Sequence, residues 1–386
     1  MTAPVLLPVE SWRILWRWRT SVPPPMADGS EQRACTAALP RVYFAGSFDV
    51  TDAQQRALHA TLIAQPTATV PVAQPHEGTP TTAAVTGAAA VVDATYCDWI
   101  ADGRRVLVVG AGGAMFDTTI SSFSGGSLTL ADGPSSGTYP AGATMVYPCV
   151  DSFVDDGQQV TRWPVNLTRW QLAGRQQVAT SIGGAGGAAV TTYASLPVLV
   201  DRPLIAGADG ESYRGGIEWA DAGGAVAVSS TWLRGVRARS GTWLIRGAAE
   251  RQGWKVLLAA LRGRWKPLLA PTWRPDATLQ AQPAGGATTL RLAESLTDLA
   301  PIATAAHVQL EFADGSVVYR TISGITDAGA YRQATLTAAL PGSIPGGSVR
   351  TVSMLETVRL GTDDVQVEYR GDWIGRVTLP LVRVAG

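Results

Sequence analysis

Charged residues are scarce in this chain of 386 residues. Only 16% are Asp, Glu, Lys or Arg, whereas soluble domains usually have roughly 25%. The 31 basic residues equal the 31 acidic ones, so the formal net charge is zero. This balance argues against a protein whose main role is to neutralise nucleic-acid phosphates. The 46% of apolar residues argue against a wholly disordered chain and provide material for more than one core.

Cysteines and long apolar runs are also few. The sequence has three widely spaced cysteines and no CxxC pair, so it indicates neither a disulfide framework nor a zinc site, and we expect folding in a reducing cytosol. Early charged residues argue against a secretory signal. Apolar runs stay shorter than the ~18 residues of a membrane span, so no span is expected. The cysteines are Cys35, Cys97 and Cys149, and the early charges are Glu10, Arg13, Arg17 and Arg19.

Glycine and proline, in contrast, are abundant, with 42 and 24 residues. The stretches between them are short and rich in β-branched residues, which is typical of strands. Strands with one buried face are predicted at 41–44 and 365–369. The sequence therefore predicts a mainly β fold.

Two segments favour helices. The first begins at a capping box formed by Thr51 and Gln54, and helix-forming residues follow to Ile63. The second spans about 248–262, where apolar residues at i, i+3, i+4 and i+7 form one stripe. Gly263 follows at the position of a left-handed C-terminal cap. The stripe consists of Trp254, Leu257, Leu258 and Leu261.

An internal repeat relates two parts of the chain. Residues 116–148 and 319–352 share the order strand, turn, strand, proline-glycine turn, strand, with Ile120 matching Ile322. Since lone hairpins are barely stable, each copy predicts a small antiparallel barrel or sandwich. We predict a discontinuous β-sandwich-like core domain with two such inserted modules, and a polar linker at the first insertion. The core comprises 1–75, 151–276 and 356–386; module 1 is 76–150, module 2 is 277–355, and the linker is Gln74–Thr86.

The glycine-rich segments do not indicate a nucleotide site. In the segment 106–115, Met115 stands where a dinucleotide fingerprint requires a small residue, so a hairpin tip is predicted instead. The segment 181–187 lacks the Gly-Lys-Ser/Thr ending of a phosphate loop and is expected to be a loop.

Residue patterns for catalysis or metal binding are sparse as well. The three histidines lack metal spacing, and no serine lies in a Gly-x-Ser-x-Gly elbow, although sites assembled from distant residues stay open. The acidic pairs at 155–156 and 363–364 lack the Asp-x-Asp-x-Asp-Gly spacing of a calcium-binding loop, so we predict that they are solvated turn residues. We therefore predict no catalytic residue, no cofactor and no metal. The histidines are His59, His76 and His307.

From Trp16 to Arg19 the sequence alternates aromatic and cationic residues. On a strand this places Trp16 and Trp18 on one face and Arg17 and Arg19 on the other. One interpretation is a nucleic-acid or membrane surface. We favour a strand whose tryptophans lie in a core and whose arginines meet carboxylates of a neighbouring subunit, since Trp and Arg are enriched at protein interfaces.

Several sequence blocks resemble a known family. Asp28–Arg33, followed by Pro40 and Arg41, resembles the "G-x-E-Q-R … P-R" block near the start of distal tail proteins from bacteriophages with long, flexible, non-contractile tails. The segments 261–264 and 271–276 are similar to the "R-G-R … F-W-L-P-T-W-x-x-D" block of these proteins, although Leu268, Leu269 and Ala270 replace its Phe-Trp-Leu. The closing segment 379–384 looks like their final strand. All these blocks fall in the predicted core domain.

The resemblance implies a structural virion protein without enzymatic activity. Such proteins form a ring, expected to be a homohexamer, that joins the tail tube to the tail tip or baseplate hub. The implied partners are further copies of the chain, the tube protein and the hub proteins, and the location is the virion tail, assembled in the host cytoplasm. Expected ring contacts are Trp16, Arg17, Trp18, Arg19, Gly29, Glu31, Gln32 and Arg33. Expected structural motif residues are Pro40, Arg41, Arg262, Gly263, Pro271, Thr272, Trp273 and Asp276.

Two other functions stay open. The repeated modules, with an aromatic residue such as Tyr139 expected at the surface, also fit a carbohydrate-binding adhesion protein of the tail tip. A cell-wall hydrolase is the third possibility, but it requires a carboxylate of raised pKa in a cleft or a metal triad, and no such motif anchors it.

Overall fold

The computed structural model describes most of the chain. The described residues are 4–22, 32–65, 67–95, 97–155, 159–163, 167–177, 189–204, 211–214, 217–222, 225–230, 236–293, 307–370 and 374–384. Strands dominate them, and they include two α-helices, so the predicted mainly β fold is confirmed.

The elements of the core domain come from three stretches of the chain. Its helices are α1 (Asp52–Ala64) and α2 (Gly247–Leu261). Its strands are β1 (Pro8–Arg17), β2 (Thr20–Ser21), β3 (Ala34–Cys35), β4 (Arg41–Thr51), β5 (Thr69–Ala73), β12 (Gln159–Trp163), β13 (Leu167–Gln176), β14 (Thr192–Tyr193), β15 (Leu196–Pro197), β16 (Glu211–Arg214), β17 (Ile217–Ala222), β18 (Ala225–Ser230), β19 (Val236–Arg246), β20 (Leu268–Pro271), β27 (Asp364–Arg370) and β28 (Ile374–Arg383).

The elements of the two modules follow a common order. Module 1 has η1 (Pro75–Glu77), β6 (Thr79–Pro80), β7 (Ala89–Val91), β8 (Arg105–Val109), η2 (Ala111–Gly113), β9 (Met115–Ser124), β10 (Ser127–Leu130) and β11 (Met145–Val154). Module 2 has β21 (Leu279–Ala281), β22 (Thr289–Leu292), β23 (His307–Phe312), β24 (Val317–Asp327), β25 (Arg332–Leu336), η3 (Pro345–Gly347) and β26 (Val349–Leu360).

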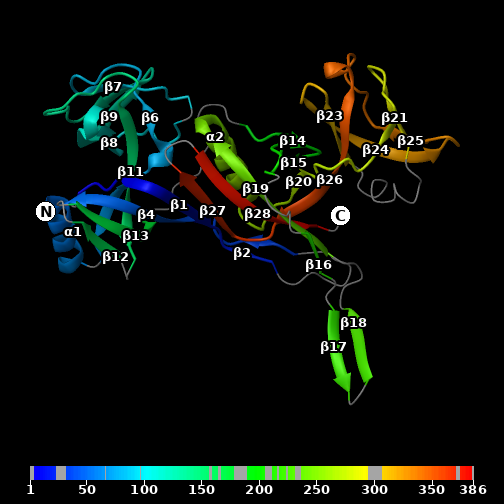
Figure 1. The fold of residues 1–386 in the computed structure, drawn as a ribbon, viewed down its shortest axis with the longest axis horizontal. Helices are drawn as coiled ribbons and strands as arrows, with labels where there is room; N and C mark the ends of the chain where they lie inside the picture. The colour runs from blue at the N-terminus through cyan, green and yellow to red at the C-terminus, as the bar shows by residue number, and fades with distance from the viewer. Residues whose placement is uncertain are drawn as a thin grey trace.

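The core is organised around one antiparallel sheet. Its main strands pair in the order β13, β4, β1, β27, β28, β19, β16. In Figure 1, α2 packs beside β19, β27 and β28, and the two modules lie on the same side of the core at opposite ends. One large apolar cluster fills the core and includes the α2 stripe and tryptophans from β1, β13 and β19.

Both predicted helices are present. The capping box of α1 is confirmed, because the Thr51 amide donates to Gln54 Oε1 at 3.0 Å and the Gln54 amide donates to Thr51 Oγ1 at 3.4 Å. The apolar stripe of α2 is buried as predicted. Gly263 has the expected left-handed conformation, with φ of 68°. The cap itself, however, is Arg262, with φ of 53°, so the left-handed turn covers two residues rather than one.

The two modules share their strand pairing. The order β7, β10, β9, β8, β11 in module 1 corresponds to β22, β25, β24, β23, β26 in module 2. Ile120 pairs with Leu130, and Ile322 pairs with Leu336, each beside a register shift. Each module has its own apolar cluster, separate from that of the core.

Each module joins the core through one long strand. Along β11, residues 145–148 pair with β8 inside module 1, and residues 149–153 pair with β5 of the core. Along β26, residues 349–354 pair with β23 in module 2, and residues 355–358 pair with β20 of the core. A strand that continues its hydrogen-bond ladder from one unit into the next leaves little freedom to bend.

Two loop predictions have different outcomes. The segment 106–115 is a hairpin as predicted, with η2 as its tip between β8 and β9. The first part of the segment Gln74–Thr86 is not a solvated linker, because five of its polar residues are buried, whereas Thr82 and Thr86 are exposed. The buried ones are Gln74, His76, Glu77, Thr79 and Thr81. Polar composition indicated exposure here, but Glu77 pairs with Lys255 of the core and Gln74 donates to the carbonyl of Val72. The segment 181–187 lies outside the described residues.

None of the described helices has the length and apolar character that crossing a membrane requires.

Candidate functional site

The aromatic and cationic residues of β1 alternate as predicted, but their contacts lie within this chain. Trp16 and Trp18 are only 5% and 2% exposed and belong to the core cluster. Arg17 faces outward and forms a bidentate pair with Asp364, at 2.7 Å for both bonds. The two tryptophan rings therefore lie in the core of this chain, as predicted, and their expected ring contacts stay a prediction. The carboxylate that Arg17 meets likewise belongs to its own chain.

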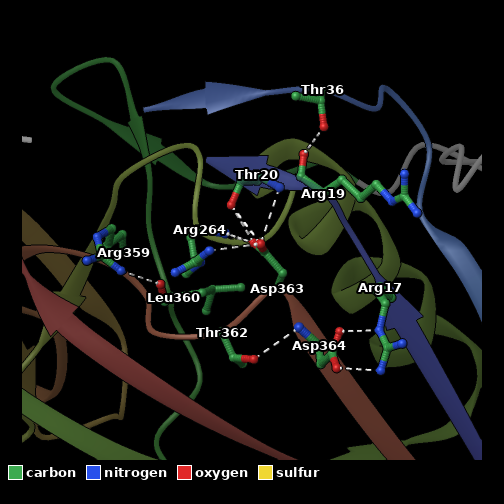
Figure 2. A network of polar contacts seen from close by, with 10 residues as sticks. All are labelled: Arg17, Arg19, Thr20, Thr36, Arg264, Arg359, Leu360, Thr362, Asp363 and Asp364. Atoms are coloured by element: carbon green, nitrogen blue, oxygen red, sulfur yellow. Dashed lines mark hydrogen bonds and ion pairs between the residues drawn. The ribbon is translucent and has the colours of Figure 1, made fainter. Parts of the chain in front are cut away.

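Asp363 connects three distant segments (Figure 2). Its carboxylate accepts hydrogen bonds from the Thr20 hydroxyl at 2.7 Å, from the Thr20 amide at 3.2 Å, and from the Arg264 amide and guanidinium at 3.0 and 3.3 Å. Its backbone oxygen accepts from the Trp18 amide at 3.1 Å. The pair 363–364 was predicted to be a solvated turn. This is wrong for Asp363, whose largely buried side chain is bonded to distant segments, whereas Asp364 pairs with Arg17 at the solvent-exposed surface.

Gly263 is required by this arrangement. A Cβ atom at this position would lie 2.5 Å from Asp363 Oδ1 and 3.1 Å from Trp18 Cβ, and its φ of 68° also favours glycine. The structure thus brings the "R-G-R" block and the Trp16–Arg19 segment together at Asp363. Arg19 has an exposed side chain, and its backbone oxygen accepts two bonds of 2.9 Å from Thr36 (Figure 2).

The "G-x-E-Q-R … P-R" block is described only in part. Gly29 and Glu31 lie outside the described residues, Gln32 is exposed and Arg33 is half-buried. Pro40 is buried, and Arg41 is exposed on β4.

Pro271, Thr272, Trp273 and Asp276 form the connection to module 2. Pro271 ends β20, and the Thr272 hydroxyl donates to Asp276 Oδ2. The same oxygen accepts from the Met354 amide of β26 at 2.6 Å. Burial raises the pKa of Asp276. We call Thr272, Asp276 and Met354 the module 2 junction.

Trp273 has an unusual backbone conformation in this connection. Its φ of 52° is uncommon for a bulky residue and must be held by its surroundings. The Arg239 guanidinium lies 5.2 Å from its ring centre, and the Arg202 guanidinium donates to its carbonyl at 2.7 Å. The "P-T-W-x-x-D" residues thus position module 2 relative to the core.

Module 1 meets the core through buried charges. Lys255 of α2 donates to Glu77 at 2.9 Å and pairs with Asp98 at 2.6 Å, while Arg251 lies 3.6 Å from Glu77. The four side chains are 3% to 10% exposed. We call Glu77, Asp98, Arg251 and Lys255 the module 1 junction. Because the module supplies the carboxylates and α2 supplies the cations, it holds the two units together.

The protonation states in this junction follow from burial and from the neighbouring charges. Burial by itself raises the pKa of Glu77, but Lys255 and Arg251 outweigh it and lower this pKa to about 2. For Lys255, burial acts to lower the pKa, and Glu77 and Asp98 raise it above its ordinary value. Glu77 is thus ionised and Lys255 charged at neutral pH, which is the state of an ion pair rather than of a proton-transfer catalyst.

His76 lies beside this junction without a charge at neutral pH. Burial lowers its pKa to about 3. Its ring packs against Tyr369 and Trp12, with centroid distances of 4.6 and 6.5 Å. Among the residues that the structure describes, no group of three or more His, Cys, Asp or Glu side chains is placed to hold a metal ion.

Two adjoining cavities border the core sheet, and the first of them also borders module 1. The first has a volume of about 110 Å³ and is bounded by the junction residues Glu77, Asp98 and Lys255. The second, of about 300 Å³, lies at the sheet end, and Arg41 and Arg175 line it. Val42 and Gln176 border both cavities.

Tyr139 is not a surface aromatic. It is 4% exposed and packs edge-to-face on Phe116 at 5.2 Å. A Cβ at Gly110 would lie 2.6 Å from the Tyr139 ring. In module 2 the position equivalent to Gly110 is Phe312, which is fully buried. The two modules thus fill this part of their cores with aromatic rings from different sequence positions. Because Tyr139 is buried, the carbohydrate-binding interpretation loses the residue on which it was based.

One sequence feature that we had not interpreted does indicate the module 1 junction, namely two cationic residues on the apolar face of α2. Arg251 and Lys255 are four residues apart and share the buried face of α2 with Leu258. Cations on an apolar stripe indicate buried partners. Their partners, Glu77 and Asp98, lie more than 150 residues away, so no local pattern identified them.

Neither a scan against models of protein families nor a search of curated proteins found a match to this chain.

Proposed function

We propose that this chain is a structural virion protein that forms a ring, expected to be a homohexamer, at the distal end of a long non-contractile phage tail. It joins the tail tube to the tail tip or baseplate hub and has no catalytic role. The observation that carries the proposal is the meeting of one block that resembles those of distal tail proteins with the segment expected to make ring contacts. The Trp16–Arg19 segment and the "R-G-R" block converge on Asp363, which lies more than 340 residues from the first.

The construction of the molecule supports this proposal. A ring built from identical subunits closes only when the rotation between neighbours is fixed. Here the core is one antiparallel sheet, and β11 and β26 carry their ladders unbroken from each module into it. Such a rigid subunit keeps a fixed angle between its two contact faces, and this angle sets the rotation between neighbours in a ring.

A projecting ribbon also supports an assembly. Strands β17 and β18 pair with each other and with no other described strand, and Figure 1 shows them extending from the core on the side away from the modules. An isolated two-stranded ribbon is marginally stable in water. We expect a neighbouring subunit or tail component to cover it.

Negative-stain imaging of the purified full-length chain, alone and with tail-tube ends, tests this function. We expect ring-shaped class averages and rings attached to tube ends. Single particles that never close into rings, even with tubes present, would contradict it. A variant in which a short Gly-Ser linker replaces residues 217–230 tests the role of the β17–β18 ribbon. We expect this variant to fold but to form no rings.

A further inference from the structure

Three arginines lie in a row on the outer face of the core sheet. Arg17 on β1 is directly opposite Arg41 on β4, and Arg175 on β13 is opposite Tyr43, two residues further along β4. Since cross-strand partners and residues i and i+2 share one face of a sheet, all three point to the same side. Like charges in such positions repel each other.

Among the described residues, a carboxylate pairs with only one of these three arginines. Asp364 binds Arg17 with two bonds of 2.7 Å. Within the described part of the chain, no carboxylate pairs with Arg41 or Arg175, and Arg175 instead lies over the ring of Phe153 at 5.8 Å. The guanidinium groups of Arg41 and Arg175 therefore repel each other, and an anion from another molecule would relieve this repulsion by binding between them.

The space for such an anion is present. The 300 Å³ cavity is lined by Arg41, Arg175, Val42, Phe153, Gln176 and Gln177. We call this cavity the arginine notch. Its volume matches the lower range of ligand sites, which is enough for a few side chains. Arginine side chains recognise carboxylates through two parallel hydrogen bonds, so a protein surface with exposed carboxylates fits it.

Module 1 provides a surface of the opposite charge. Residues 76–150 contain six carboxylates and two arginines, while the whole chain is neutral, so the rest of the chain carries the balancing positive excess. Glu77, Asp98 and Asp117 pair with cations of this chain. Asp102 and Asp132 are exposed and have no cation partner among the described residues.

Asp102 and Asp132 lie at one edge of module 1. The next residue after Asp102, Gly103, donates its amide to the Ile120 carbonyl at 2.7 Å, and Ala131 donates to the Thr119 carbonyl at 2.8 Å. Both carboxylates therefore flank the same point of β9. We call them the acidic edge.

We propose that the arginine notch of one copy receives the acidic edge of module 1 from a second copy, which makes this contact a ring interface. The inference rests on the proposed function and names the partner of that assembly. The notch and the acidic edge are different surfaces of one chain, so each copy uses both, and the contact is of the head-to-tail type that generates rings.

A charge-swap experiment on the full-length chain tests the contact. The notch variant carries Arg41→Glu and Arg175→Glu, the edge variant carries Asp102→Arg and Asp132→Arg, and the swap variant carries all four changes. Rings are counted by mass photometry over a range of concentrations, and thermal unfolding verifies that each variant is folded. The control Arg56→Glu with Arg383→Glu makes the same charge change at two exposed arginines elsewhere.

We expect the notch and edge variants each to require at least about tenfold more protein for half-assembly. The swap variant and the control should assemble like the parent chain. If the parent forms rings and the notch variant does so equally well, this inference is overturned while the proposed function stands. If both single-surface variants fail and the swap does not recover, the pairing of these two surfaces is wrong. A parent chain that forms no rings overturns both proposals.

Discussion

The two modules share a strand order, yet the core holds them by different chemistry. Module 1 is fixed by four buried charges, with carboxylates from the module and cations from α2. Module 2 is held by uncharged contacts and by one carboxylate, Asp276, which accepts from a hydroxyl and from the Met354 amide; the core residue Tyr193 also packs on Tyr319, and its hydroxyl lies 2.8 Å from the hydroxyl of Thr321. Two modules with the same strand order can thus be attached to the core by different interactions.

The difference has consequences for stability. Removing one partner of a buried ion pair leaves an uncompensated charge, which costs about 3–5 kcal/mol. Removing an acceptor from a hydrogen-bonded turn costs about 1–3 kcal/mol. The module 1 junction is therefore the more sensitive of the two to substitution and to acid.

The largest expected effect is that of Lys255→Ala. This change leaves Glu77 and Asp98 buried without their shared cation, and we expect a loss of about 3–5 kcal/mol in the free energy of unfolding of module 1 and its contact with α2. Urea unfolding together with hydrogen exchange of β6 and β8 measures it. Lys266→Ala, at an exposed lysine beyond the same helix, is the matched control and should change stability by less than about 0.5 kcal/mol. Equal effects of the two variants would refute the buried network.

A smaller effect is expected for Asp276→Ala. The Met354 amide and the Thr272 hydroxyl lose their acceptor, so module 2 should lose about 1–3 kcal/mol, visible as faster hydrogen exchange in β23 and β26. Module 1 should be unaffected. Asp151→Ala, at an exposed carboxylate of β11, serves as the control. Faster exchange in β8 instead of β23 would show that the two junctions are not independent.

The stabilities of the two junctions should respond differently to acid. The folded-state pKa of Glu77, about 2, lies below its ordinary value of 4.5, and that of His76, about 3, lies below 6.5. Both groups therefore stabilise the folded form at neutral pH and lose this contribution as pH falls, His76 from about 6.5 and Glu77 from about 4.5. Burial raises the pKa of Asp276 and also that of Asp98 in the module 1 junction, so the contributions of these two carboxyl groups become more favourable as pH falls. The contrast between the junctions therefore rests on Glu77 and His76.

Hydrogen exchange corrected for the intrinsic pH dependence tests this contrast. Between pH 6.5 and 3.5 we expect protection to decrease in β6 and β8 before it decreases in β23. Simultaneous loss in both modules, or earlier loss in module 2, would contradict the assignment of the buried charges.

The smallest effect is expected for Arg17→Ala. The Arg17–Asp364 pair has good geometry but is 43% and 41% exposed, and exposed pairs contribute about 0.2–1 kcal/mol. Thermal unfolding at low and high salt measures it, and the difference between parent and variant should shrink as salt rises. A loss as large as that of Lys255→Ala would mean that exposure does not distinguish the two kinds of ion pair.

Local patterns predicted the elements but not their polar connections. The capping box at Thr51, the α2 stripe and the alternation at Trp16–Arg19 are properties of short segments, and the structure contains all three. Asp363, in contrast, bonds Thr20 across 343 positions. Sequence composition gives no information on such pairs, because any exposed turn has the same residue types.

The incorrect predictions have the same physical origin. The segment Gln74–Thr86 is polar, yet its Glu77 is buried because Lys255 and Arg251 compensate its charge. Tyr139 lies among glycines and serines, yet it is buried because Gly110 leaves room for its ring. In both cases a distant partner decides exposure.

The molar mass of the purified full-length chain in solution tests the central claim most directly. Light scattering after size exclusion should give six times the 40.4 kDa monomer mass, or another closed multiple of it, at micromolar concentration. A mass of 40.4 kDa at every concentration, with and without tail-tube protein, would contradict the account.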